Sequence, residues 1–317
     1  RVPPGRAVEY TDRVRGPQRF DTDAIGDFVI RRTDGTPAFF FSNAVDDALM
    51  GISHVLRGED HLTNTPRQLL LLEALGLPAP GYGHLPLVLA EDGAPLSKRA
   101  GSLSLRALRE DGYLPGALQN YLARLGHHYD DDGAMDLGAL AAGFDPARVG
   151  SAPARFDPGQ LRHWQREAVG RLAPPAWWLW VQSAVADVVP PDQAEAFQEA
   201  VRDNVLFPGE AAEWARRLFE DPLAITPEAA AALAGADPAV FDAALGEGGE
   251  AAGFGALAER VKRATGARGR GLFAPLRAAL TGLTHGPELG RIYPLLGRER
   301  VRARLLAARA TAAAGTR

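Results

Sequence analysis

The sequence predicts an α/β fold that is followed by an all-α region. The first observation is a strand–helix–strand run, with short apolar strands expected at 51–56 and 84–90 and a helix at 67–75 between them. A crossover of this kind favours a parallel sheet, because both strands then run in the same direction. The second observation is that the hydrophobic pattern becomes helical at Leu103 and stays helical to the end of the chain.

The segment before the strand–helix–strand run predicts a hairpin and a short helix. Residues 28–32 and 37–41 are largely apolar and flank Asp34–Gly35, a pair that is typical of tight turns between strands. We therefore expect two strands joined at this turn. A helix is expected at 43–50, directly before the strand at 51–56.

Cap and breaker residues set the expected ends of the helices. Thr65 is expected to cap the helix at 67–75, with Pro66 at the first helical position and Gly76 at the end. A second amphipathic helix is expected at 115–126, because it begins with a proline, has one apolar face and stops at a glycine.

Composition limits the classes of protein to which the chain can belong. The 317 residues, of which 46% are hydrophobic, are enough for two or three domains with buried cores. The chain has no cysteine, which excludes a disulfide scaffold, a cysteine zinc site and thiol catalysis. It also has no signal-peptide pattern and no uncharged apolar run of about 18 residues, so we expect a cytoplasmic protein without a membrane span.

Charge is distributed unevenly along the chain. Residues 251–317 contain 13 Lys and Arg against 3 Asp and Glu, whereas the rest of the chain contains 22 against 36. A basic C-terminal region favours a polyanionic partner such as a nucleic acid. The alternative is that these arginines lie on solvated helices of a chain that uses Arg as its general basic residue.

The loop at 91–101 contains Lys98, one of only two lysines in a chain whose other 33 basic residues are arginines. The loop follows the apolar strand at 84–90, and ligands of parallel sheets bind beyond the carboxyl ends of the strands. The loop at 57–61 is expected at the same edge. A lysine supplies a compact charge on a flexible stem, which suits contact with phosphate. The alternative is a solvated surface lysine.

Several sequence blocks occur in the order of one known family. The most specific is 43–68, which ends its strand with Arg57-Gly-Glu-Asp-His61, and another is Pro95-Leu-Ser-Lys-Arg99. Further blocks lie at 27–37, 112–126, 156–164, 271–282 and 285–289. Together, over nearly the whole chain, they resemble the bacterial glutamyl-tRNA synthetases, which are class I aminoacyl-tRNA synthetases.

The resemblance implies a fold and a division into domains. It implies that 1–102 is the remainder of a Rossmann catalytic domain with a parallel sheet, and that 1–25 is the end of an inserted acceptor-binding region. A helical stem-contact domain is then expected at 103–168 and a helical anticodon-binding domain at 169–317. The first ATP signature of the family has no counterpart here, so we expect the chain to be about the C-terminal two-thirds of such an enzyme.

The resemblance also implies an activity and a set of partners. It implies a monomeric enzyme that activates L-glutamate with ATP to glutamyl-adenylate, with Mg²⁺ accompanying ATP, and transfers the glutamyl group to the 3′ end of tRNA(Glu). One alternative is a glutaminyl-tRNA synthetase-like protein, since the pocket that separates acid from amide lies partly in a region without a counterpart here. Another is a non-catalytic tRNA-binding fragment or remnant, which the missing ATP signature favours.

The lysine loop supplies most of the implied ATP contacts. Lys98 is the expected catalytic residue, because a mobile ammonium stabilises the charge that builds on the phosphates in the transition state. Ser97 either contacts phosphate or stabilises a turn, and Arg99 either contacts phosphate or faces solvent. The family commonly has a basic residue where this chain has Pro95. The implied ATP-binding residues are Glu59, Asp60, Leu96, Ser97, Lys98 and Arg99.

Each of the candidate residues that follow the strand at 51–56 has two possible roles. Arg57 matches the family's arginine that binds the substrate amino acid, because a planar guanidinium meets a carboxylate bidentately. Its alternative is an ion pair with Glu59 or Asp60. Those two acids either bind the ribose hydroxyls of ATP or balance nearby arginines.

Two residues before that strand complete the implied glutamate site. Asn43 matches a polar contact to glutamate, and its alternative is a helix cap. Phe39 stands where the family commonly has a tyrosine that contacts glutamate, so one hydroxyl is missing from the implied site.

Arginines near the C-terminus are the implied contacts with tRNA, and a solvated surface arginine is the alternative for each. The candidates are Arg268, Arg270 and Arg277. No metal site is predicted, zinc included. His54, His61 and His84 do not share one helix face, and no cysteine joins them.

Overall fold

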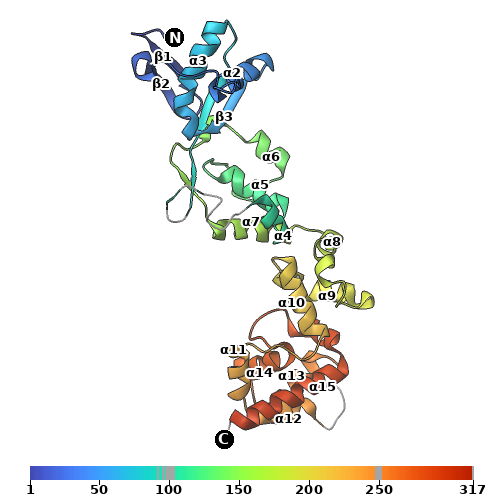
Figure 1. Cartoon of the computed structure of the whole chain (residues 1–317). Coiled ribbons are helices and arrows are strands. Elements are labelled where there is room, and N and C mark those ends of the chain that lie inside the picture. Colours follow the sequence, from blue (N-terminus) through green and yellow to red (C-terminus); the bar gives the residue numbers. More distant parts are fainter. Residues whose placement is uncertain (91–92, 95, 97–103, 247–251, 316–317) are drawn as a thin grey trace. The chain divides into compact units, whose positions relative to one another are not determined.

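The computed structural model describes residues 1–90, 93–94, 96, 104–246 and 252–315. It divides into two compact units, each with its own buried core (Figure 1). Unit 1 comprises Arg1–Ser104 and Leu114–Glu167, and unit 2 comprises Leu105–Tyr113 and Ala168–Arg317. No helix in the described ranges is long and apolar enough to cross a membrane.

Unit 1 begins with two pairs of strands. Strands β1 (Ala7–Asp12) and β2 (Gly16–Asp21) form an antiparallel hairpin. Strands β3 (His54–Gly58) and β4 (Gly81–Leu85) form a parallel pair. The predicted parallel arrangement is therefore confirmed for these two strands.

Helix α3 (Thr65–Leu75) crosses between the parallel strands and packs beside helix α2 (Phe39–Leu49). The register of the parallel pair places Arg57 opposite His84. The hairpin is attached to β4, because the backbone N–H of Arg13 donates to the carbonyl of Tyr82 at 2.8 Å. The end of β1 is thereby brought to the carboxyl ends of the parallel strands.

The rest of unit 1 consists of short elements. Strands β5 (Val88–Leu89) and β6 (Ala154–Arg155) form a second parallel pair. The remaining elements are α1 (Thr22–Ile25), the 3₁₀ helices η1 (Glu59–Asn64) and η2 (Pro146–Arg148), α5 (Pro115–Arg124), α6 (Leu137–Ala142) and α7 (Pro158–Gly170), whose last residues belong to unit 2.

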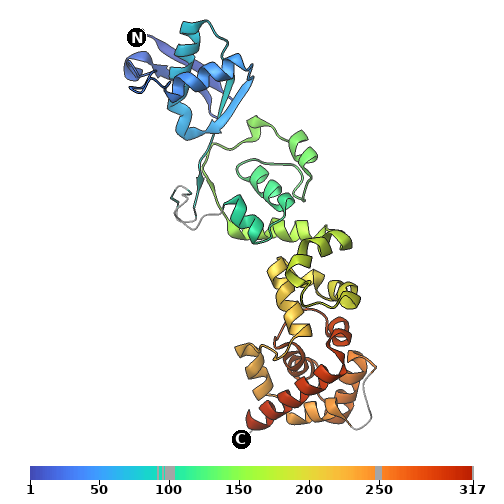
Figure 2. The same ribbon diagram turned by 45° about the vertical axis from the view of Figure 1, so that its right-hand side comes forward.

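Unit 2 is helical throughout its described part, as predicted for the C-terminal region. Trp177, Phe197 and Phe241 are fully buried in its core. The chain ends in α15 (Leu289–Gly315), which breaks at a glycine with φ 69° and packs beside α12 (Pro238–Leu245) (Figure 2). The other elements are α4 (Leu105–Glu110), α8 (Pro174–Val185), η3 (Pro191–Gln193), α9 (Ala194–Val201), η4 (Arg202–Asn204), α10 (Pro208–Phe219), α11 (Pro227–Ala234), α13 (Phe254–Thr265) and α14 (Arg270–Thr281).

The hairpin predicted before α2 is only partly confirmed. The turn at Asp34–Gly35 is present, and the N–H of Thr36 donates to the aspartate side chain at 2.9 Å. The prediction of two flanking strands is wrong. The two segments share only one isolated bridge, and the second segment is helical from Phe39. Ala38 is extended, and its carbonyl accepts the N–H of Ser42, so the first helical turn closes earlier than predicted.

The predicted strands of the parallel pair are shifted. The strand expected at 51–56 begins at His54, and it is not fully buried, because Leu56 is 42% exposed. The strand expected at 84–90 is divided. Pro86 has no N–H to donate to a ladder, and it separates β4 from β5.

The predicted helix ends agree better with the structure. Gly76 ends α3 in the left-handed conformation with φ 64°, and the helix expected at 115–126 is confirmed as α5. The role predicted for Thr65 is wrong. It is the first residue of α3 rather than a cap, and its hydroxyl is engaged by side chains of the candidate site.

Candidate functional site

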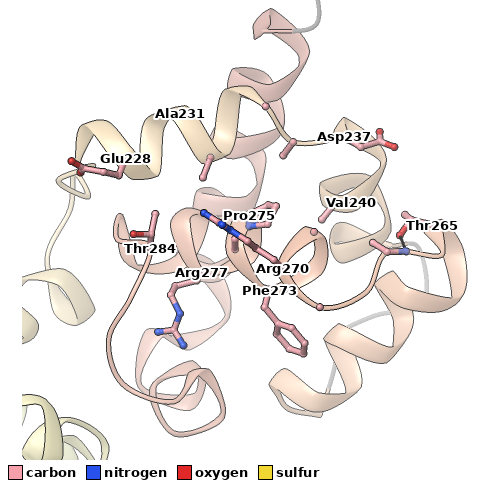
Figure 3. A pocket seen from close by; sticks show the side chains of 17 residues that line it. Glu228, Ala231, Asp237, Val240, Thr265, Arg270, Phe273, Pro275, Arg277 and Thr284 are labelled. Carbon is pink, nitrogen blue, oxygen red and sulfur yellow. Dashed lines mark hydrogen bonds between the residues drawn. The ribbon is translucent and has the colours of Figure 1, made fainter.

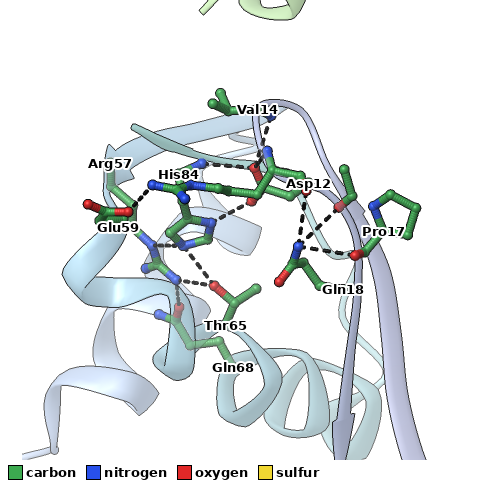
Figure 4. A network of polar contacts seen from close by, with 11 residues as sticks. Asp12, Val14, Pro17, Gln18, Arg57, Glu59, Thr65, Gln68 and His84 are labelled. Atoms are coloured by element: carbon green, nitrogen blue, oxygen red, sulfur yellow. Dashed lines mark hydrogen bonds and ion pairs between the residues drawn. The ribbon is translucent and has the colours of Figure 1, made fainter. Parts of the chain in front are cut away.

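The candidate site surrounds Arg57 at the carboxyl end of β3. Its Nε donates to His84 Nε2 at 3.2 Å, and its NH2 donates to Thr65 Oγ1 and Gln68 Oε1, both at 2.7 Å (Figure 4). The ring of Tyr82 lies 5.2 Å from the guanidinium carbon. Three of the five N–H groups of this side chain are therefore held by neutral acceptors from β4 and α3.

The remaining nitrogen of Arg57, NH1, is buried and has no hydrogen-bond partner among the described residues. Burial lowers the pKa of Arg57, while Tyr82, Tyr10 and Asp47 act in the opposite direction. The Oδ2 atom of Asp47 is likewise buried without a partner in the described chain, and burial raises the pKa of that carboxyl. A guanidinium with two unused N–H groups in such a setting can bind an anionic oxygen through NH1.

His84 is fully buried and links Arg57 to Asp12. Its Nδ1 lies 2.5 Å from Asp12 Oδ2, and its Nε2 lies 3.0 Å from Thr65 Oγ1. A guanidinium only donates, so His84 Nε2 must accept the hydrogen bond from Arg57 Nε. The imidazole is therefore neutral, and it carries its proton on Nδ1, which donates to Asp12.

The directions of the pKa shifts of His84 and Asp12 agree with a neutral imidazole beside an ionised carboxylate. Burial lowers the pKa of His84 and outweighs the raising effect of Asp12. Burial alone would raise the pKa of Asp12, but hydrogen bonds outweigh it and hold that pKa below its usual range. Asp12 Oδ1 accepts three backbone N–H groups, from Val14 and Arg15 at 2.9 Å and from His84 at 3.1 Å.

Two of the predicted glutamate contacts lie on α2. Asn43 lies inside this helix, so the alternative that it caps the helix is wrong. Its Oδ1 accepts from Gln68 Nε2 at 2.8 Å, which connects Asn43 through Gln68 to Arg57. Phe39 is the first residue of α2 and is 43% exposed, with its ring centroid 5.3 Å from that of His61. The structure thus joins Asn43, but not Phe39, to the hydrogen-bond network of Arg57.

The two acids after β3 have different surroundings. Glu59 forms an ion pair with Arg15 and accepts the backbone N–H of Leu87 at 3.2 Å, so it balances a nearby arginine in this structure. Asp60 is mostly exposed, with 57% of its side chain accessible. Over the described residues, no ion pair joins either acid to Arg57, so that alternative for Arg57 is not observed.

The lysine loop falls largely outside the described residues. Leu96 is described, and its N–H donates to the Val88 carbonyl at 3.3 Å. Ser97, Lys98 and Arg99 lie outside the described residues, and their implied roles stay predictions.

The predicted tRNA contacts are Arg268, which precedes α14, Arg270, which begins it, and Arg277, which lies within it. Arg268 and Arg270 are exposed, whereas Arg277 is partly buried and donates to a backbone carbonyl at 2.7 Å. Burial lowers the pKa of Arg277. Arg270 and Arg277 line a hollow of about 1180 Å³ together with Phe273, whose side chain is exposed (Figure 3). Arg268 is not among the residues that line it.

Sequence reasoning missed most of the polar side chains that hold Arg57. The pattern singles out His84 only as a metal candidate and Thr65 only as a cap, and it gives no role to Asp12 or Gln68. A histidine that begins an otherwise apolar strand is the one signal that could have found a buried polar contact. Within the described ranges, no group of three or more His, Asp or Glu side chains is placed to hold a metal ion.

Two family models match the chain. Residues 1–161 match the model described as the catalytic domain of class I tRNA synthetases (E and Q). Residues 171–309, all within unit 2, match the model described as an anticodon binding domain. The first match contains the whole hydrogen-bond network of Arg57, and the second contains the hollow beside α14.

Similar proteins match nearly the whole chain but extend beyond it. A glutamate–tRNA ligase 2 from Nitrosococcus oceani is 58% identical over 306 residues, which is 96% of this chain and 65% of that protein. One of the same name from Alkalilimnicola ehrlichii is 57% identical over 317 residues, 99% of this chain and 66% of that protein. A glutamate tRNA ligase crystal structure from Elizabethkingia meningosepticum, in complex with its amino acid, has a TM-score of 0.83 at 25% identity and covers 98% of this chain and 67% of its own. The chain thus spans just under two thirds of the length of the first two relatives.

Proposed function

Because the chain belongs to the class I tRNA synthetases of the glutamate and glutamine type, we propose that it is part of a glutamate–tRNA ligase. In this reaction a carboxylate oxygen of L-glutamate attacks the α-phosphorus of ATP, and pyrophosphate leaves. The glutamyl group then passes from the adenylate to a 3′-terminal ribose hydroxyl of tRNA(Glu), and AMP leaves. Mg²⁺ would accompany ATP, since it commonly binds through phosphates and few protein ligands.

The state of Arg57 is the observation that carries this proposal. Its guanidinium is partly buried and held by three neutral side chains, and NH1, whose surface is buried, has no partner in the described chain. A buried charge is costly unless it is paired, so the site favours an anionic ligand over a neutral one. The N–H groups of Nε and NH2 are already used in hydrogen bonds. We therefore propose that a glutamate carboxylate binds to NH1 alone and not bidentately to two nitrogens of the guanidinium.

The ATP site is proposed from the sequence. We assign the approach to the phosphates to Lys98, with Ser97, Arg99 and Leu96 beside it, because a flexible ammonium can follow the charge that develops there. Asp60 keeps an exposed carboxylate near the same strand ends and is the better candidate for a ribose hydroxyl. Glu59 would have to leave its ion pair with Arg15 to do so.

The hollow beside α14 supports a contact with an unpaired region of tRNA. RNA bases in loops are bound by stacking on aromatic rings and on guanidinium planes. The hollow provides both, through Phe273, Arg270 and Arg277, and the region at 251–317 carries the excess positive charge. Arg268 is proposed as a contact with the phosphate backbone nearby.

The test is ATP–pyrophosphate exchange by the full-length protein that carries this sequence, with tRNA(Glu) present and either L-glutamate or L-glutamine. Exchange that depends on glutamate is expected. Arg57→Met should raise the KM for glutamate about 100-fold, because a charge that meets the substrate carboxylate is removed. Arg19→Met, on the exposed side of β2, is the control.

The possible results separate the candidate functions. Exchange that depends on glutamine instead would support a glutaminyl-tRNA synthetase-like protein. Binding of tRNA without exchange would support a non-catalytic remnant, which two sequence departures favour: Phe39 in place of a tyrosine and Pro95 in place of a basic residue. Either result would overturn the proposed ligase activity.

A further inference from the structure

We propose that His84, fixed in one tautomer by Asp12, is a positioning residue that orients the guanidinium of Arg57 toward the substrate carboxylate. This inference rests on the proposed function and adds to it the way in which Arg57 is oriented. Hydrogen bonds connect the carboxylate of Asp12, the imidazole of His84 and the guanidinium of Arg57, and each of the three residues lies on a different strand (Figure 4).

The first step is the geometry of the guanidinium. Arg57 is held at Nε by His84 and at NH2 by Thr65 and Gln68, so both ends of its plane are fixed. Loss of the Nε contact would free the plane to rotate about its last side-chain bonds. The contacts on Nε and NH2 therefore fix the direction of the two N–H groups on NH1, which have no partner in the described chain. Functional side chains need this kind of support to keep a productive orientation.

The second step is the tautomer of His84. Its Nε2 can accept from Arg57 only while the proton is on Nδ1. With the proton on Nε2, two N–H groups would face each other across 3.2 Å and the contact would be lost. An ionised carboxylate at 2.5 Å from Nδ1 selects the Nδ1–H form, as a carboxylate does for other functional histidines.

The third step is the placement of Asp12 itself. Its Oδ1 accepts the backbone N–H groups of Val14, Arg15 and His84, so the carboxylate cannot turn away from the imidazole without breaking three contacts. Only Oδ2 is left for His84 Nδ1. The hairpin turn after β1 thus transmits a fixed orientation through Asp12 and His84 to Arg57.

This arrangement makes Asp12→Asn a sharp test. The amide oxygen of the new side chain must remain at the Oδ1 position, because three N–H groups point at it. The amide nitrogen then faces His84 Nδ1 as a donor, which drives the histidine proton to Nε2. The substitution therefore reverses the tautomer while it keeps size and backbone contacts.

The experiment uses the full-length protein and measures three quantities. They are the KM values for glutamate and ATP in pyrophosphate exchange, the thermal midpoint, and the ¹⁵N shifts of labelled histidine rings, which distinguish protonated from unprotonated ring nitrogens. We expect Asp12→Asn to move the proton of His84 to Nε2 and to raise the KM for glutamate about 10- to 100-fold, the usual range for such supporting contacts. The KM for ATP should change little, and the thermal midpoint should fall only moderately, because the amide keeps the backbone contacts but loses the charge of the carboxylate.

Two further variants control for a merely structural role. Asp136→Asn makes the same chemical change at an exposed helix cap of unit 1, where Asn is an equally good cap, and should change none of the three quantities. In a His84→Gln background, which has no tautomer to reverse, Asp12→Asn should add less than about 2-fold to the KM for glutamate, because the coupling between the two sites is lost.

The outcomes separate the inference from the proposed function. A reversed tautomer with an unchanged KM for glutamate would overturn the inference, as would equal losses in both KM values together with a lower thermal midpoint. If Asp12→Asn does not fold, the ring shifts of the unaltered protein decide, and a proton on Nε2 of His84 would overturn the inference. Absence of glutamate-dependent exchange in the unaltered protein would instead overturn the proposed function.

Discussion

Gln68 donates from its side-chain amide to Asn43 Oδ1 at 2.8 Å. The oxygen of the same amide accepts from Arg57 NH2 at 2.7 Å, so one neutral side chain connects α2 to the guanidinium. Because the amide carries no charge, it holds Arg57 without compensating it. An arginine whose task was structural would be expected to pair with a carboxylate when it is buried.

Gln68→Glu is expected to raise the KM for glutamate, because the new carboxylate would pair with Arg57 NH2 and compensate its charge. It would also place an acceptor against Asn43 Oδ1. We expect an increase of about 10- to 100-fold in pyrophosphate exchange, with little change in the KM for ATP. Gln68→Met, which removes the same hydrogen bonds without adding charge, should cause a smaller increase. Equal increases in the two variants would contradict the electrostatic explanation.

The sequence predicts the scaffold of this site because the scaffold is encoded locally. The proline in the first turn of α3 and the glycine at its end mark a helix between two apolar strands that are close to it in sequence, so the crossover and the parallel pair follow from short patterns. The position of Arg57 at a strand end follows from them. The contact between Asp12 and His84 joins residues 72 positions apart, and no local pattern reports it.

The error at α2 has a different cause. Phe39 begins three consecutive phenylalanines, which fit a buried strand and a buried helix equally well over so short a stretch. Packing of α2 beside α3 decides in favour of the helix. The same packing places Asn43 opposite Gln68, so the polar contact could not be predicted until the helix was known.

Lys98→Ala is expected to reduce the rate of glutamate activation about 10²- to 10³-fold, the usual effect of removing one donor to transition-state charge. Binding of tRNA should stay nearly unchanged. Lys262→Ala is the matched control, because Lys262 is the other lysine of the chain and pairs with Glu259 on the surface of α13. Pyrophosphate exchange and tRNA binding by filter retention measure the two effects. Parallel losses in both would indicate a structural role for Lys98.

Acidification is expected to destabilise unit 1 in two steps. The pKa of His84 lies below its ordinary value of 6.5 in the folded state, so the unfolded chain takes up this proton first as the pH falls through that value. The pKa of Asp12 lies below its ordinary value of 3.8, which adds a second loss at lower pH. Both contributions to stability are complete above about pH 6.5 and are lost as the pH falls.

Urea unfolding at a series of pH values measures this dependence. Arg57, Tyr82 and Tyr10 also face the pair, but their ionisation does not change over the acidic range. His84→Gln should remove the first step and leave the second. A free energy of unfolding that is the same at pH 7.5 and pH 5.5 in the unaltered protein would contradict the depressed pKa of His84.

Arg304 is expected to be essential for the stability of unit 2. It is 5% exposed and donates from NH1 to the carbonyls of Arg217 at 2.8 Å and Leu280 at 2.6 Å. Arg304→Leu leaves these buried carbonyls without their donor, and we expect a loss of about 3 kcal/mol in the free energy of unfolding. Arg302→Leu, at an exposed position of the same helix, should cost far less. Similar losses in both, measured by urea unfolding, would show that helix composition rather than these contacts is responsible.

Phe273→Ala is expected to weaken tRNA binding, because the exposed ring beside Arg270 and Arg277 offers a stacking surface for an unpaired base. Stacking of one base on an aromatic ring is worth about 1–3 kcal/mol, which corresponds to a rise of about 5- to 150-fold in the KM for tRNA. The KM for glutamate in the aminoacylation assay should not change.

Phe273→Leu is the matched variant for this prediction. The ring of Phe273 contacts that of Phe254 at a centroid distance of 6.1 Å and so contributes to packing inside unit 2. Leucine retains apolar volume at this position. If the ring stacks on a base, leucine should lose nearly as much tRNA affinity as alanine while it keeps the thermal midpoint. If leucine restores affinity as well as stability, the ring supports the fold of the hollow and does not contact tRNA.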